Sequence, residues 1–98
     1  MTLRVVFHQL AEDELNEAAA YYARTSIRLG EAFIAEVQHA VDLLAALPSA
    51  GREIEADVRW WVVKRFPYSV LYRERQDHLR ILAIAHQKRR PFYWRGRV

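Results

Sequence analysis

The feature that most constrains this chain is a pair of strand-like runs in its last third. Residues 68–75 and 78–86 are rich in β-branched and aromatic residues, and only Gln76 and Asp77 separate them. Two such runs joined by a two-residue link are typical of an antiparallel β-hairpin. Apolar residues occupy both alternating sets of positions in the second run, so we expect that strand to be central in a sheet and buried on both faces.

Helical spacing of apolar residues predicts two helices in the first half of the chain. The first runs roughly from Gln9 to Arg24, and acids crowd its N-terminal half, where the helix dipole favours negative charge. The second runs from about Glu31 to Leu47; Gly30 marks a break before it and Pro48 ends it. So short a link predicts a helical hairpin whose shared apolar stripe packs on a sheet.

Two further strand patterns complete the predicted fold. Residues 3–8 and 58–66 are β-prone, whereas residues 49–53 have the composition of a loop. The predicted order is therefore β-α-α-β-β-β in one domain covering residues 1–98. This is an α+β fold, with a helical hairpin on one face of a small, mostly antiparallel sheet and the first strand beside the last.

The adjacent rings Trp60 and Trp61 place one large side chain on each face of their strand, because side chains alternate along a strand. The face opposite the helices then needs apolar cover or a partner. We expect that face to carry Trp61, Val63, Leu82 and Ile84.

Composition excludes several classes of protein. No stretch approaches the ~18 consecutive apolar residues of a membrane span, and the N-terminus lacks the pattern of a signal peptide. We therefore expect a soluble, cytoplasmic protein. Cysteine is absent and the four histidines show no ligand spacing, so we expect neither a metal nor another cofactor.

Charge is divided unevenly along the chain. Residues 1–58 hold four cations and ten acids, a net charge of −6, whereas residues 59–98 hold eleven cations and two acids, a net charge of +9. One interpretation is that the two halves neutralise each other within the fold. The alternative is an acidic partner for the second half, where the cations lie among aromatic rings.

The residues in this order resemble the ParE/RelE superfamily of toxins from type II toxin–antitoxin systems. The resemblance rests on Phe66-Pro67-Tyr68, on the run from Leu82 to His86, on the final segment from Arg89 to Trp94, and on the helical hairpin. It implies a growth-inhibiting toxin that is held inactive in a hetero-oligomer with a cognate antitoxin. Its target would be DNA gyrase for a ParE-like member, or the ribosome and its mRNA for a RelE-like member.

Residues for either activity cluster late in the chain. RNA cleavage needs groups that transfer protons and cations that hold phosphate. The nuclease alternative would use His86, Tyr93 and Arg90 as catalytic residues. The predicted target-binding or phosphate-binding residues are Lys64, Arg65, Arg73, Arg89 and Arg90.

The ParE-like alternative is favoured by two departures from the nuclease pattern. Residues 60–63, Trp-Trp-Val-Val, stand where RelE-like chains carry lysines, and Ser69 stands where they carry an arginine. We therefore expect binding to a protein target such as DNA gyrase, with antitoxin contacts at Trp61, Val63 and Arg59. A third possibility is a decayed member that binds only its antitoxin and, through it, operator DNA.

Overall fold

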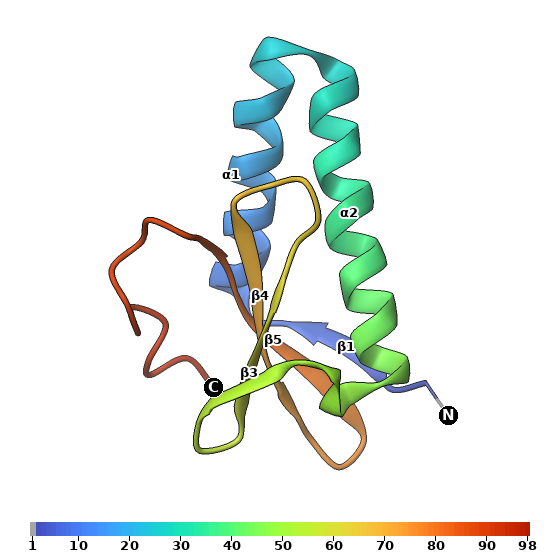
Figure 1. Ribbon diagram of the computed structural model, residues 1–98, viewed down its shortest axis with the longest axis vertical. Helices are drawn as coiled ribbons and strands as arrows, with labels where there is room; N and C mark the ends of the chain where they lie inside the picture. The colour runs from blue at the N-terminus through green and yellow to red at the C-terminus, as the bar shows by residue number, and fades with distance from the viewer. Residues whose placement is uncertain (1) are drawn as a thin grey trace.

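The computed structural model describes residues 2–98 and places two helices on one face of a five-stranded sheet (Figure 1). This confirms the α+β class and the helical hairpin. The elements in chain order are β1 (Arg4–Phe7), α1 (Gln9–Thr25), α2 (Ile27–Ala46), a short 3₁₀ turn (Pro48–Ala50), β2 (Arg52–Glu55), β3 (Val58–Val62), β4 (Tyr68–Glu74) and β5 (His78–His86).

The two helices are joined by a single residue, Ser26, rather than by a loop at Gly30. The Ser26 hydroxyl accepts a hydrogen bond from the Leu29 N–H at 3.4 Å, so it caps the start of α2, and its own N–H bonds the Tyr22 carbonyl that ends α1. Gly30 lies inside α2, where a Cβ would stand 2.9 Å from both the Ala19 oxygen and the Ala23 Cβ. Glycine is therefore needed here for close helix packing, not for a break. Neither helix combines the length and the apolarity needed to cross a membrane.

His8 caps the N-terminus of α1, and this cap predicts a pH effect. Its Nδ1 accepts the Leu10 N–H at 3.0 Å, which requires an unprotonated Nδ1. Burial, followed by the nearby Arg80 and Arg97 charges, lowers the His8 pKa below the ordinary value of 6.5. The unfolded chain therefore takes up the proton first, so this contribution to stability is complete above pH 6.5 and declines as the pH falls below it.

We expect unfolding monitored in urea to show a steeper loss of stability between pH 7 and pH 5 for the wild type than for His8→Asn. Asparagine caps helices well and does not titrate. Equal slopes for the two proteins would contradict this role of His8.

The sheet has the strand order β1-β5-β4-β3-β2, in which β1 runs parallel to β5 and every other pair is antiparallel. The predicted place of the first strand beside the last is confirmed, and β5 is an interior strand. The prediction that residues 49–53 form a loop is wrong in part, because β2 begins at Arg52 and pairs with β3. Its charged sequence, Arg-Glu-Ile-Glu, is tolerated because β2 is an edge strand with one side open to solvent.

A bulge in β5 shifts the alternation of its side chains. Leu71 pairs with Ala83 and Tyr72 pairs with Ile81, so Leu82 is an extra residue. Ile81 and Ile84 consequently pack in the helix-side core, whereas Leu82 packs on the other face.

The expected composition of the second face is therefore mostly wrong. Trp61, Val63 and Ile84 belong to the helix-side core, and of the four residues expected on the second face only Leu82 lies there. Trp61 and Val63 share one side of this segment because side chains alternate along it, and that side faces the helices, whereas Val58 and Trp60 of β3 pack on the second face.

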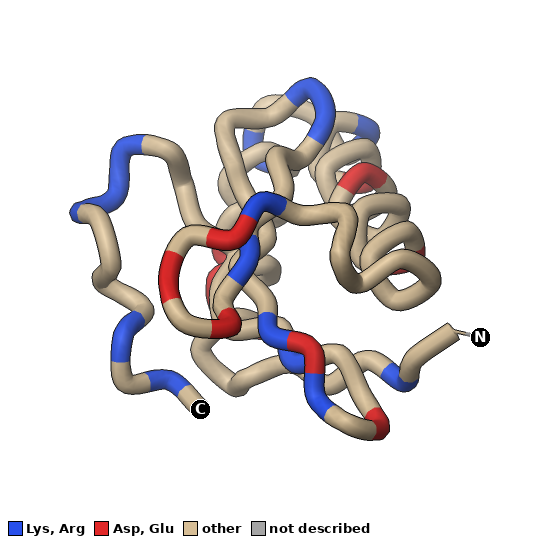
Figure 2. Tube along the Cα trace, turned by 60° about the horizontal axis from the view of Figure 1, so that its bottom comes forward, with Lys and Arg blue, Asp and Glu red and all other residues tan. Residues whose placement is uncertain are grey.

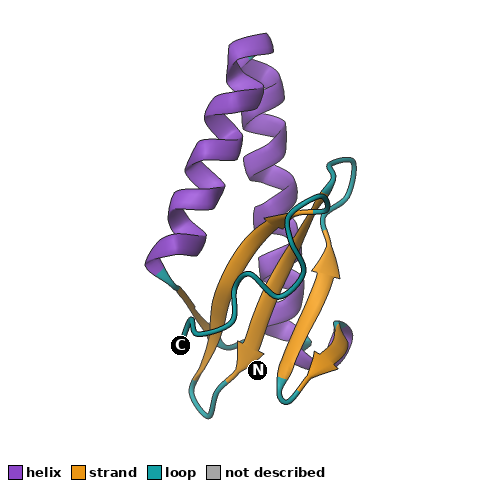
Figure 3. Cartoon of the chain, turned by 90° about the vertical axis from the view of Figure 1, so that its left-hand side faces the viewer, coloured by secondary structure: helices purple, strands orange, loops and turns teal. Residues whose placement is uncertain are grey.

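The second face is covered in part by the chain itself. Residues 87–98, here called the tail, cross this face in front of the strands, opposite the helices (Figure 3). Trp94 is only 5% exposed and packs against the second-face core. This core consists of Val58, Leu71, Leu82, Ala83, Ala85 and Trp94.

Candidate functional site

The tail is fastened to α1 by a carboxylate that is mostly buried. Glu14 Oε1 lies 2.9 Å from Arg97 Nη1, and the two side chains are only 14% and 11% exposed. Glu14 Oε2 accepts the Tyr93 hydroxyl at 2.8 Å and Arg97 Nη2 at 3.1 Å. One side chain of α1 thus holds two side chains of the tail.

The same pair satisfies backbone groups at the β5 bulge. The Ile84 N–H donates to Glu14 Oε1 at 3.0 Å, and the Leu82 carbonyl accepts from Arg97 Nη1 at 3.0 Å. A bulge takes such groups out of the strand ladder, and buried backbone groups need another partner. The bulge and the path of the tail therefore depend on each other.

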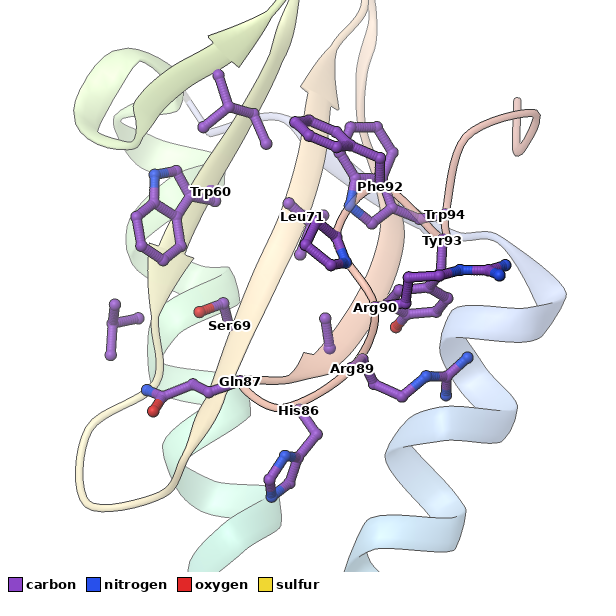
Figure 4. A pocket seen from close by; sticks show the side chains of 14 residues that line it. Trp60, Ser69, Leu71, His86, Gln87, Arg89, Arg90, Phe92, Tyr93 and Trp94 are labelled. Carbon is purple, nitrogen blue, oxygen red and sulfur yellow. The ribbon is translucent and has the colours of Figure 1, made fainter.

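Between the tail and the second face lies a groove of about 520 Å³. Its floor is formed by Trp60, Leu71 and Ala85, and Phe92 and Trp94 line it from the tail (Figure 4). Phe92 has a φ of +61°, an uncommon backbone conformation for a residue with a Cβ, and it stands where the tail turns back toward the sheet. We refer to this feature as the tail groove.

Most arginines of the second half are paired within the chain. Arg73 and Arg75 contact Asp57 at 2.9 and 3.4 Å, and Arg95 forms a two-pronged bond with Glu55. Burial opposes ionisation of Glu55, but the Arg95 hydrogen bond outweighs it and lowers the Glu55 pKa. The interpretation that the two halves neutralise each other is therefore correct for this part of the surface.

Four other cations of the second half have side chains that form neither an ion pair nor a hydrogen bond within residues 2–98, whereas Arg80 bonds the Val98 backbone oxygen. They are Lys64, Lys88, Arg89 and Arg90. Lys64 lies in the β3–β4 loop with Arg65, which is 3.9 Å from Glu36, and the others lie in the turn after β5. The Gln87 N–H bonds the Pro67 carbonyl at 2.9 Å, so the loop and the turn meet at one end of the sheet. Figure 2 shows the blue segments of this loop and turn.

The predicted proton-transfer residues are each engaged elsewhere. His86 Nδ1 accepts the Lys88 N–H at 3.0 Å, and its ring packs edge-on against Tyr68. Burial and the hydrogen bond to Glu14 raise the Tyr93 pKa far above that of a free phenol. Both residues line the groove, but in Figure 4 their rings point in different directions. No hydrogen bond or ring contact joins His86 to Tyr93 within residues 2–98.

A comparison with protein families finds a match over most of the chain. A family model described as "ParE toxin of type II toxin-antitoxin system, parDE" matches residues 5–91. The chain belongs to the ParE toxin family. A solved structure titled "Chromosomal ParDE TA system from P. aeruginosa" is similar, with a TM-score of 0.75 and 21% identity over 87% of this chain and 96% of that one. A search of curated proteins found no match.

In this ParE-family chain the predicted binding residues separate into two groups. One group lies on the two loops at one end of the sheet and consists of Lys64, Arg65, Arg89 and Arg90. Arg73 lies apart from it on β4, where it pairs with Asp57 of the β2–β3 turn. The predicted antitoxin contacts do not form one exposed patch. Val63 is buried, Trp61 packs in the helix-side core, and Arg59 donates to the Gly51 carbonyl at 2.8 Å. Their role in antitoxin binding stays a prediction.

Sequence reasoning missed Glu14 and Arg97, which hold the tail over the second face. Glu14 is one of four acids near the start of α1, and nothing in that cluster distinguishes it from its neighbours. Arg97 lies 83 residues away, so only the fold brings them together. Trp60 did carry a signal, because a tryptophan pair in one strand must place a ring on the second face.

Proposed function

We propose that this ParE-family chain is a toxin that acts by binding a protein target such as DNA gyrase and that a cognate antitoxin neutralises it. Its place of action would be the cytoplasm, where such a target resides. The binding surface would comprise the tail groove and the cations on the two adjoining loops, Lys64, Arg65, Arg89 and Arg90.

One observation carries this proposal over the nuclease alternative. The Tyr93 hydroxyl, the strongest candidate for proton transfer in the tail, is bound to Glu14, and its pKa is raised. General acid–base catalysis works best with a pKa near the working pH. A phenol held in this way is better suited to a structural role than to proton transfer. The nearby cations without ion-pair partners in the described chain, Arg89 and Arg90, are suited to binding an acidic surface of a target.

The experiment that tests the proposal uses Tyr93→Phe. If Tyr93 is structural, the variant should lose about 1 kcal/mol of stability with its hydrogen bond and still inhibit growth at nearly wild-type level. If Tyr93 transfers a proton, activity should fall by about 10² to 10⁴ with the fold intact. His86→Ala is the companion variant, and growth inhibition after induction and urea unfolding are the two measurements.

Two further readouts separate the possible targets. Purified toxin should inhibit supercoiling by DNA gyrase, and induction should stop DNA replication before translation. Co-expression of the antitoxin should restore growth. Translation stopping first, together with loss of toxicity in folded Tyr93→Phe, would overturn the proposal in favour of mRNA cleavage.

A further inference from the structure

The tail groove has the size and lining of a site for one or two bulky side chains. Its volume of about 520 Å³ lies in the usual range for ligand pockets. Two indole rings, Trp60 and Trp94, and the Leu71 side chain present apolar surface to it. Phe92 and Val62, at its rim, are 41% and 49% exposed. Such an arrangement resembles the aromatic-lined pockets that receive an anchor residue from a binding partner.

The cations next to the groove define the charge of the segment that would fit. Arg89 and Arg90 line the groove from the turn after β5, and neither forms an ion pair within residues 2–98. Figure 4 shows their guanidinium groups on the α1 side of the turn, so carboxylates that flank an anchor residue would meet them as the segment leaves the groove. The Arg89 guanidinium is held 3.9 Å from the centre of the Tyr93 ring and is thus already oriented.

We propose that the tail groove receives an acidic loop of the toxin's target, with one bulky apolar residue inserted against Trp60 and Trp94. The carboxylates that flank this residue pair with Arg89 and Arg90. This inference rests on the proposed function and adds the chemistry of the segment that is recognised. A volume of about 520 Å³ suits one or two bulky side chains, which is what an anchor residue on a protruding loop would supply.

The test changes charge at one exposed position on the groove rim. Val62→Glu places a carboxylate where an acidic loop would dock, and Val62→Lys places a cation at the same point. Ile27→Glu is the matched control, because Ile27 is also apolar and exposed and lies in the first turn of α2, outside the groove.

Inhibition of purified DNA gyrase by each purified toxin is measured, together with its affinity for the antitoxin and its melting temperature. We expect Val62→Glu to inhibit at least about tenfold less than wild type. Val62→Lys should match or exceed the wild type, and Ile27→Glu should be unchanged.

Several results would overturn the inference. If the wild type inhibits gyrase and Val62→Glu inhibits it equally, no acidic loop enters the groove. If Val62→Glu and Val62→Lys are equally weak, the effect is one of shape and not of charge. If Val62→Glu loses the antitoxin but still inhibits gyrase, the groove belongs to the antitoxin. If the wild-type toxin does not inhibit gyrase, the proposed function itself is overturned. This failure is distinct from failure of the groove inference, which shows only in the variants of an active wild type.

Discussion

Replacing Glu14 with alanine should lower the free energy of unfolding by about 3 kcal/mol or more. The substitution leaves the buried Arg97 charge without its partner and the Ile84 N–H without an acceptor. Removing one member of a buried ion pair typically costs about 3–5 kcal/mol. Urea unfolding at pH 7 measures the change.

The matched control for this substitution is Glu17→Ala, one turn further along α1. Glu17 is exposed and makes no hydrogen bond or ion pair within residues 2–98, so its loss should change stability by less than about 0.5 kcal/mol. The double variant Glu14→Gln/Arg97→Met should be more stable than Glu14→Ala, because it leaves no buried charge unpaired. A cost below about 1 kcal/mol for Glu14→Ala would show that the tail is not held as described.

Tyr72→Phe should cost about 2–4 kcal/mol, because one hydroxyl serves two backbone groups. The Tyr72 side chain is fully buried; it donates to the Pro48 carbonyl at 2.7 Å and accepts the Gly51 N–H at 2.9 Å. Each buried group left unpaired costs about 1–3 kcal/mol. Gly51 has no side chain, and this lets the hydroxyl approach, since a Cβ there would collide with it.

Tyr68→Phe is the control, because Tyr68 lies on the same strand and its hydroxyl makes no hydrogen bond within the described part of the chain. Thermal unfolding of the two variants should therefore separate them clearly. Equal melting temperatures would mean that the link between β4 and the turn before β2 contributes little to stability.

The sequence predicted the parts of the fold that rest on local patterns. The helical stripe that contains Phe33, Val37 and Leu44 is buried, and the short link between β4 and β5 forms the expected hairpin. The position of β1 beside β5 also followed from general rules of topology. These features depend on the periodicity of apolar side chains and on the length of the links between elements, and both can be read from a single sequence.

The parts that failed depend on contacts between distant residues. Glu14 and Arg97 bind backbone groups at the bulge around Leu82, and this bulge interrupts the regular alternation that the sequence of β5 predicts. The strand β2 is charged and takes its conformation from pairing with β3. The sequence gives the net charge of each half of the chain, but it does not show which charges are paired. Only the fold shows that Arg73 and Arg75 pair with Asp57, whereas Arg89 and Arg90 have no ion-pair partner within residues 2–98.

The parallel pairing of β1 with β5 also has a consequence for how the toxin folds during its synthesis. Arg4 aligns with His78, so the opening strand has no hydrogen-bonding neighbour in the sheet until more than three quarters of the chain has left the ribosome. Contacts of such long sequence separation slow folding. A nascent toxin would therefore pass through synthesis with its sheet unfinished, and a product truncated before β5 would leave β1 unpaired and would also lack the tail that lines one side of the groove.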